Sequence, residues 1–410
     1  MSFAVSRLGV RGEGVADEPE GAVYVARALP GERVEGEIAE GRIARPRIIE
    51  AAPERRRAPC PHYNACGGCA LQHASDAFVA AWKAEVVRRA LEAQGLPAPI
   101  RGVATSPPAS RRRAKLSGRR TRGGPLVGFH GRSSDMLTAV PGCHVLVPEL
   151  RAALPALEAL VDAGGTRKGE MQLTVTASRA GPDVAVSGGA PLGGRLGARL
   201  AEFAARHGLA RLVWQGEIVA VAAPPVQDFG GIAVVPPPGA FLQATGHGEE
   251  TLRACVAEAV GAAGRVADLF AGCGTFALPL ARVAEVHAVE ADAAMLAALD
   301  AGWRGAEGLR RVSVESRDLF RRPLLAAELA RFDAVVIDPP RAGAAAQVAA
   351  LAASGVPRIA MVSCNPASFA RDARVLAAAG YRLAWVQVVD QFRWSAHVEL
   401  AAAFTKPDIA

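Results

Sequence analysis

The chain has 410 residues, which is long for a single domain, because hydrophobic cores stop growing at roughly 250–300 residues. Half of the residues are hydrophobic and 21% are charged, a balance that excludes a largely disordered or fibrous protein. The formal net charge of +7 fits a polyanionic partner but does not by itself identify one.

The N-terminal residues MSFAVSRLGVRGEG lack the apolar core of a signal peptide. The longest uncharged stretch, residues 229–248, contains three consecutive prolines and several glycines, which would break a membrane helix. We therefore expect a cytoplasmic protein with no membrane span.

Two segments precede residue 226. Residues 1–53 alternate apolar and charged residues between glycine turns, which predicts a small OB-like β-barrel. For residues 54–225 we expect an α+β central domain. A helix is predicted over 81–95, with Trp82, Val86, Ala90 and Leu91 on one face, and another over 191–207, among the strand-like runs QLTVTAS, DVAVSG and RLVWQGEIVAVAA.

Residues 226–410 differ in sequence pattern from the segments that precede them. Strand-like runs alternate with Ala- and Leu-rich helical segments, which predicts a parallel, doubly wound α/β sheet of Rossmann-like type. Ligands of such a sheet bind outside the carboxyl ends of its strands. The five runs cover residues 265–270, 285–290, 311–316, 332–338 and 358–364.

The first of these runs ends in a glycine-rich turn. Gly272, Gly274 and Ala277 fit a dinucleotide-binding pattern, and Glu290 ends the second run, where an acid would bind ribose hydroxyls. The local pattern does not separate a dinucleotide from another adenosine cofactor. The fourth run ends in Asp338-Pro-Pro-Arg, a rigid turn that favours a class I S-adenosylmethionine-dependent methyltransferase over a dehydrogenase.

A cysteine and a carboxylate complete the expected site. Cys364 ends the fifth run, where a thiolate can act as a covalent catalyst, and Glu399 begins a last apolar strand, where a carboxylate can accept a proton. Uracil C5 is a weak nucleophile until a thiolate adds to C6, and a base must afterwards remove the C5 proton. Methylation of a nitrogen or oxygen would not require this pair.

Three further cysteines crowd into Cys60-x5-Cys66-x2-Cys69, and Cys143 is the best candidate for a fourth ligand. The spacing alone fits both zinc, with His62 or His73 as a ligand, and an iron–sulfur cluster. The densest basic run, Arg111 to Arg122, could be a strand that presents cations to phosphates, or simply a solvated surface.

The segments DLFAGCGTF, DPPR, VSCNP and HVE, in this order, resemble the RNA uracil-5-methyltransferase family over essentially the whole chain. The resemblance implies Cys364 as nucleophile and Glu399 as general base. It also implies S-adenosylmethionine contacts by six residues, namely Gln243, Phe270, Thr275, Glu290, Asp318 and Asp338. Thr275 stands where related enzymes often carry Asn, and Asp318 lies in a loosely matching segment.

The cysteine segments are similar to the iron–sulfur branch of the family, which implies a [4Fe-4S] cluster on Cys60, Cys66, Cys69 and Cys143. The N-terminal segment resembles the RNA-binding module called TRAM. We therefore expect a monomeric enzyme that acts on a flipped-out uridine, with 23S rRNA favoured. The alternatives are a tRNA uracil-5-methyltransferase, an amino-group methyltransferase and a non-catalytic RNA-binding assembly factor.

Overall fold

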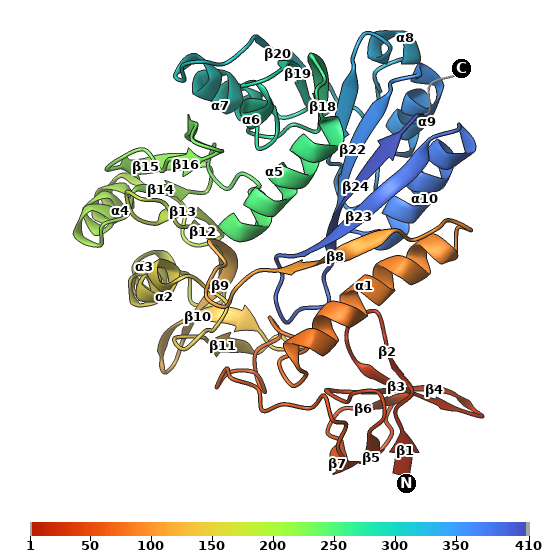
Figure 1. Ribbon diagram of the computed structural model, residues 1–410. Coiled ribbons are helices and arrows are strands. Elements are labelled where there is room, and N and C mark those ends of the chain that lie inside the picture. The colour runs from red at the N-terminus through yellow and green to blue at the C-terminus, as the bar shows by residue number, and fades with distance from the viewer. Residues whose placement is uncertain (1, 407–410) are drawn as a thin grey trace.

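The computed structural model describes residues 2–406, and its N-terminal segment is all β (Figure 1). The strands form two small sheets, ordered β1-β5-β7 and β2-β3-β4-β6, that share one core around Phe3, Val25 and Ile43. This agrees with the expected β module. Its strands are β1 (Ser2–Ala4), β2 (Arg7–Leu8), β3 (Gly14–Glu18), β4 (Gly21–Val25), β5 (Arg33–Glu35), β6 (Arg42–Ile43) and β7 (Arg47–Glu50).

The cysteine-rich loop leads into helix α1 (Asp76–Glu92). The helix begins five residues before the predicted start, because the Ser75 side chain accepts a hydrogen bond from Phe78 N and caps it. The predicted apolar face is confirmed in part. Leu91 is buried and Trp82, Val86 and Ala90 pack against the cores, whereas the most buried residues are Val79, Lys83, Val87 and Leu91. A lysine enters the buried face because its ammonium group has a buried partner, Asp390.

The middle of the chain folds around a seven-stranded sheet in the order β11-β10-β9-β12-β13-β14-β15. The predicted strand-like runs and the helix near 191–207 are confirmed, whereas helices α2 and α3 were not anticipated. The strands are β9 (Arg113–Thr121), β10 (Gly124–His130), β11 (Leu137–Ala139), β12 (Glu170–Thr176), β13 (Asp183–Ser187), β14 (Arg211–Trp214) and β15 (Glu217–Val221), and the helices are α2 (Pro148–Ala152), α3 (Leu154–Gly164) and α4 (Gly194–Arg206).

The C-terminal sheet has eight strands in the order β20-β19-β18-β21-β22-β24-β23-β8, and the first five are parallel. The predicted doubly wound α/β sheet is therefore confirmed, with an antiparallel strand β24 inserted beside β22. The strands are β8 (Ile100–Thr105), β18 (Arg265–Leu269), β19 (Glu285–Glu290), β20 (Val312–Ser316), β21 (Ala334–Ile337), β22 (Arg358–Ser363), β23 (Arg382–Asp390) and β24 (Glu399–Thr405).

Two separate hydrophobic cores cover the two faces of this sheet. One contains buried residues of α5, α6 and α7, and the other contains residues of α1, α9 and α10. A short hairpin, β16 (Gln227–Asp228) with β17 (Ala233–Val234), precedes α5. The helices are α5 (Gly246–Val260), α6 (Ala277–Leu280), α7 (Ala293–Arg304), α8 (Ala326–Leu329), α9 (Ala345–Ser354) and α10 (Pro366–Ala378).

The sheet crosses the expected boundary at residue 225. Strand β8 pairs in parallel with β23, and Figure 1 shows β8, in orange, beside the blue C-terminal strands. Helix α1 packs on the same sheet through Val87 and Leu91. The segment 54–225 is thus shared between two sheets, because residues 76–105 complete the edge of the C-terminal one. In residues 2–406, no helix is both long and apolar enough to cross a membrane.

Candidate active site

A cavity of about 880 Å³ lies at the carboxyl ends of the parallel strands. This is the edge at which doubly wound sheets bind their ligands. Every site residue predicted from the sequence lines this cavity, namely Cys60, Cys66, Cys69, Cys143, Gln243, Phe270, Thr275, Glu290, Asp318, Asp338, Cys364 and Glu399.

The turn after β18 is strained in a way that suits a ligand site. Phe270 has a φ of 63°, a backbone conformation that bulky residues rarely adopt outside functional sites. Gly274 has a φ of 94°, and a Cβ there would lie 2.8 Å from Leu299 Cγ, so only glycine lets α7 pack against the turn. The turn therefore brings backbone close to the cavity, as the glycine spacing predicts.

The Glu290 carboxylate is fixed by backbone amides. Its Oε2 accepts a hydrogen bond from Gly272 N (3.1 Å), and its Oε1 accepts from Ala291 N (2.7 Å) and Asp292 N (3.0 Å). These contacts orient the carboxylate and leave one lone pair free, on Oε2. Such a group can accept a hydrogen bond from a ribose hydroxyl.

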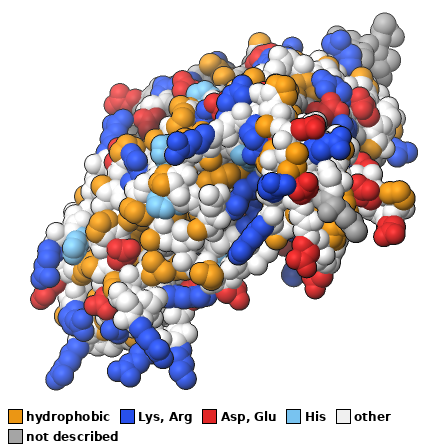
Figure 2. Space-filling model, turned by 90° about the horizontal axis from the view of Figure 1, so that it is seen from below, with side chains coloured by type: hydrophobic (Ala, Val, Ile, Leu, Met, Phe, Trp, Pro, Cys, Tyr) orange, Lys and Arg blue, Asp and Glu red, His pale blue; other side chains and the backbone are white. Residues whose placement is uncertain are grey.

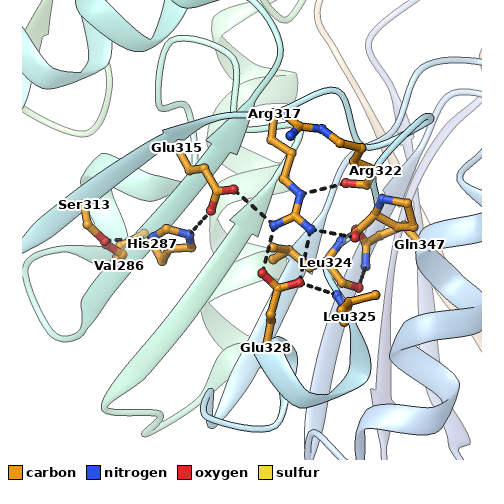
Figure 3. A network of polar contacts seen from close by, with 11 residues as sticks. Val286, His287, Ser313, Glu315, Arg317, Arg322, Leu324, Leu325, Glu328 and Gln347 are labelled. Atoms are coloured by element: carbon orange, nitrogen blue, oxygen red, sulfur yellow. Dashed lines mark hydrogen bonds and ion pairs between the residues drawn. The ribbon is translucent and has the colours of Figure 1, made fainter.

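The loop after β20 carries Asp318 and Phe320 to the cavity wall, and Arg317 holds it in place (Figure 3). The Phe320 ring lies 5.5 Å from that of Phe270. All five N–H groups of the Arg317 guanidinium are used, on the carboxylates of Glu315 and Glu328 and on two carbonyl oxygens of the loop. Arg317 thus ties both ends of the loop together.

Replacing Arg317 by methionine is expected to weaken binding of S-adenosylhomocysteine, the product of the cofactor that the sequence resemblance implies, by about tenfold, since the loop loses its fixed geometry. Calorimetric titration measures this affinity. The matched control is Arg101→Met, because Arg101 also contacts both carboxylate oxygens of one glutamate, Glu258, at 2.6 and 2.7 Å, but does not line the cavity. Equal affinities in both variants would contradict the role given to Arg317.

Two buried acids stand where β18 and β21 end. Burial raises the pKa of Asp338 to about 7, and burial together with the charge of Asp338 raises the pKa of Asp268 well above its usual range. Asp268 was not among the predicted site residues, although it immediately precedes the glycine turn. A positively charged ligand in the cavity would stabilise the ionised form of both acids.

Strand register brings Cys364 and Glu399 together. Ser363, the last residue of β22, pairs with Leu400 of the antiparallel strand β24, so the residues just beyond them in the cavity direction are Cys364 and Glu399. Asn365 caps α10 and donates to Arg341 O, which fixes the turn behind the cysteine. The predicted nucleophile and base therefore face one another at adjacent strand ends.

The surroundings of Cys364 and Glu399 disfavour the ionised form of both groups. Burial, then the charges of Glu399 and Asp338, raise the pKa of the Cys364 thiol to about 11, while Arg341 acts in the opposite direction. Burial and the charge of Asp338 raise the pKa of Glu399 to about 8. In the free protein both groups are therefore largely protonated at neutral pH.

Helix α1 anchors the loop between β23 and β24, which carries Phe392 and His397 into the cavity. The Lys83 ammonium is fully buried and binds both the Asp390 carboxylate and Phe392 O. Arg393 forms an ion pair with Asp76 at the start of the same helix. Breaking a buried pair by removing one partner is strongly destabilising, so these contacts hold the loop rigidly.

The four cysteines of the predicted ligand set line one end of the same cavity. Burial raises the pKa of Cys69 to about 12, and negative charge on Cys143, Cys66 and Cys60 acts in the same direction. Gly67 is required here, because a Cβ at this position would lie 2.7 Å from His130 O. Three cysteines of the segment 60–69 and the distant Cys143 therefore line the same part of the cavity.

The histidines proposed as zinc ligands have other partners. His62 Nε2 lies 3.1 Å from Gly142 N, and His73 Nδ1 lies 2.6 Å from the Tyr63 hydroxyl. Within residues 2–406, no three His, Cys, Asp or Glu side chains are grouped in a way that would hold a metal ion. The two hydrogen-bond contacts engage one ring nitrogen of each histidine, while His73 Nε2 is buried with no hydrogen-bond partner among the described residues.

The basic run from Arg111 to Arg122 covers β9 and its flanks, and several of its cations are paired within the protein, while binding of phosphates by this run stays a prediction. Arg112 pairs with Glu249, Arg119 with Glu170 and Arg120 with Asp162. Arg111 lines the cavity, while Lys115 and Arg122 are exposed. Figure 2 shows that Lys and Arg side chains are dispersed over the face it presents, with several gathered at one end.

Comparison with known proteins agrees with this geometry. A family model described as tRNA (uracil-5-)-methyltransferase matches residues 238–406. An uncharacterized RNA methyltransferase of Brucella suis is 44% identical over 404 residues, which cover 98% of this chain and 97% of the relative. A 23S rRNA (uracil(1939)-C(5))-methyltransferase of Chromohalobacter salexigens is 35% identical, with 98% of this chain and 89% of the relative covered.

The chain belongs to the RNA uracil-5-methyltransferase family. It is thus an enzyme that transfers a methyl group from S-adenosylmethionine to RNA. A tRNA (uracil-54, C5)-methyltransferase of Pyrococcus abyssi, solved with S-adenosylhomocysteine, shares the fold with a TM-score of 0.77 at 20% identity, and 99% of each chain is covered. The two structures therefore share their fold over nearly the whole chain, including the N-terminal segment.

Proposed function

We propose that the protein methylates C5 of a uridine in 23S rRNA through a covalent adduct on Cys364. The observation that carries the proposal is the juxtaposition of Cys364 and Glu399 at neighbouring strand ends, in the cavity that also holds the cofactor turn. A methyltransferase that acts on an amino group would have no use for this pair. A non-catalytic assembly factor would have no use for the whole constellation.

In the proposed reaction, the Cys364 thiolate adds to C6 of the uracil, and the resulting enolate uses C5 to attack the methyl group. Glu399 then accepts the proton that C5 carries, the C5–C6 double bond re-forms, and Cys364 leaves as a thiolate. Each electron pair used in the addition is returned in the elimination. Glu399 ends the cycle protonated, so it must lose this proton to solvent before the next turnover.

S-adenosylmethionine supplies the methyl group, and the residues around the cofactor turn fit it. We propose that Glu290 binds a ribose hydroxyl, that Phe270, Thr275 and Asp318 line the adenosine, and that Gln243 and Asp338 flank the methionine part. The strained turn at Phe270 and the amide-held carboxylate of Glu290 support this assignment. The donor's positive charge would lower the pKa values of Cys364 and the nearby acids, and so help the thiolate to form.

The rRNA target is favoured because a relative at 35% identity over nearly the whole chain bears the name of a 23S rRNA enzyme. A tRNA target is the second candidate, since the family model and the solved structure both bear tRNA names. Mass-spectrometric mapping of 5-methyluridine in rRNA and tRNA, from cells with and without the gene, separates them. Loss of a methyluridine from 23S rRNA is expected, and loss from tRNA alone would refute the rRNA target.

The proposed architecture has three parts, a TRAM-like module over 1–53, a central region over 54–225 and a catalytic region over 226–410. A flipped-out uridine would enter the cavity from a single-stranded or loop region of the RNA. An RNA substrate of this kind places the proposed activity in the cytoplasm, and one complete cavity per chain is consistent with a monomer.

We also propose that Cys60, Cys66, Cys69 and Cys143 hold a [4Fe-4S] cluster. Four thiols that line a common cavity end match the ligands of such a cluster. Within residues 2–406 the four thiols do not stand in a group that would hold a metal ion, so the proposal rests on the sequence resemblance and on the cavity end that the cysteines share. The cluster's role in the proposal is structural, since the methylation itself is redox-neutral.

Protein purified without oxygen is expected to be brown and to contain about four iron atoms per chain. Changing Cys69 to serine should remove the colour and most of the iron, whereas changing Cys255 to serine should retain both, because Cys255 is buried in α5 outside the cavity. Iron analysis and absorbance spectra measure these differences. A colourless protein with one zinc per chain would overturn the assignment.

A further inference from the structure

Gln391 is a buried residue that contacts both the proposed base and a proposed cofactor-binding residue but does not line the cavity. It follows β23 directly and is 2% exposed. Its Nε2 donates to Gln243 Oε1 at 2.6 Å and to Glu399 Oε2 at 3.1 Å. Gly248 in the first turn of α5 makes room for it, since a Cβ there would lie 2.7 Å from Gln391 Cβ.

The backbone N–H of Ala244 determines the orientation of the side-chain amides of Gln391 and Gln243. Ala244 N donates to Gln391 Oε1 at 2.8 Å, and a backbone N–H can only donate. The oxygen of Gln391 must therefore face Ala244, and its NH₂ group must face the other two side chains. Because two NH₂ groups would repel one another, Gln243 must in turn present its oxygen to Gln391.

The orientation of Gln243 follows from this chain of contacts. With its oxygen turned toward Gln391, its own NH₂ group is directed away from Gln391 as a donor. Gln243 lines the cavity, so this donor is available to an acceptor on a bound ligand, such as a carboxylate or carbonyl oxygen. The same Gln391 NH₂ group donates to Glu399, which favours the ionised form that a base needs.

We infer that Gln391 is a positioning residue, which orients Gln243 as a hydrogen-bond donor and holds Glu399 as a hydrogen-bond acceptor. This inference rests on the proposed function of Cys364 and Glu399. It adds that the cofactor-binding and proton-accepting halves of the site are linked through one amide, whose direction is set by the backbone of Ala244.

Two effects follow from removing that amide. Gln391→Met keeps a side chain of similar length but loses both donors, so Gln243 is free to rotate and Glu399 loses a favourable contact. Binding of S-adenosylhomocysteine is expected to weaken by about tenfold. The pH at which breakdown of the covalent RNA adduct is half-maximal should rise by about one unit, because Glu399 ionises less readily.

The charged and titratable groups around Glu399 are the same in the wild-type protein and in Gln391→Met. Asp338 after β21 and Cys364 after β22 face it, Arg341 faces Cys364, and His397 lies two residues before it. A shift in the pH profile of the variant therefore reports the lost amide. The two effects are measured independently. Calorimetry gives the affinity for S-adenosylhomocysteine, and quenched single-turnover reactions on denaturing gels give the breakdown of the adduct.

The matched control is Gln387→Met on the same strand. Gln387 is partly buried and also donates hydrogen bonds, to Gly102 O and Val388 O, but lies outside the cavity. It should leave both the affinity and the pH profile unchanged. Gln391→Glu provides a second variant of nearly identical shape, which replaces the donor by an acceptor and should raise the half-maximal pH at least as far.

A double-variant cycle tests whether Gln391 acts through Gln243. If it does, Gln391→Met adds no further loss of affinity once Gln243 has been changed to methionine. Wild-type affinity and an unshifted pH profile in Gln391→Met and Gln391→Glu would overturn the inference. If Cys364→Ala stayed active or Glu399→Gln released its adduct normally, the proposed function itself would fail, which is a distinguishable result.

Discussion

The variant Cys364→Ala is expected to lose methyl transfer by at least about a thousandfold, and to lose the covalent RNA adduct entirely. Without a thiolate to add to C6, uracil C5 stays too weak a nucleophile to attack the methyl group. Transfer is measured with labelled S-adenosylmethionine. The adduct is measured on denaturing gels with RNA that carries 5-fluorouridine, which cannot undergo the final elimination because C5 bears no removable proton after methylation.

The control for this variant is Cys255→Ala, which removes a buried thiol of α5 outside the cavity and should retain both activities. Affinity for S-adenosylhomocysteine should be nearly unchanged in Cys364→Ala, which shows that the cavity is intact. Methylation by Cys364→Ala near the wild-type rate would contradict the covalent route. It would point instead to an acceptor with its own lone pair, such as an amino group.

Much of the C-terminal sheet could be predicted because each parallel strand is a short, continuous apolar run that ends in a recognisable turn. The predicted runs over 265–270, 332–338 and 358–364 correspond to strands β18, β21 and β22. Carboxyl ends of parallel strands share one edge, so side chains that follow such runs converge whatever the strand order. This is why the predicted cofactor residues line one cavity.

The position of Glu399 opposite Cys364 could not be predicted from the strand patterns. It depends on β24 entering the sheet antiparallel to β22, and on the register that pairs Ser363 with Leu400. An apolar run such as LAAAF specifies a buried strand but neither its neighbour nor its direction. The family resemblance supplied the role of Glu399, while the register supplies the contact.

Interactions between distant segments also escaped the sequence analysis. The helix α1 buries Lys83, which a search for apolar faces scores as a surface residue, because Asp390 lies 307 positions later. The basic run likewise seemed free, since Glu170 and Glu249, the partners of Arg119 and Arg112, lie far along the chain. The sequence shows the charge of each residue but not the residue with which it forms an ion pair.

The variant Glu399→Gln is expected to form the covalent adduct on ordinary uridine RNA and to retain it, because the amide cannot accept the C5 proton. Adduct should accumulate to at least about tenfold the wild-type level in single-turnover reactions, while the first methyl transfer still occurs. Since burial raises the pKa of Glu399 to about 8, adduct breakdown in the wild-type protein should accelerate as pH rises through that range. In the variant this dependence should disappear.

Stability against pH gives an independent check that the same carboxyl group is responsible. The unfolded chain releases the Glu399 proton near the ordinary pKa of 4.5, whereas the folded protein retains it until about pH 8. The folded state therefore binds more protons between these values, and this group lowers the free energy of unfolding progressively from pH 4.5 to 8. Glu399→Gln carries no such group, so its melting temperature relative to wild type should rise over this interval and level off above it. A variant that accumulated adduct without this pH-dependent gain would show that the pKa of Glu399 is not raised in the folded protein, and the pH dependence of adduct breakdown would then come from another group, with Asp338 as the next carboxyl group to replace.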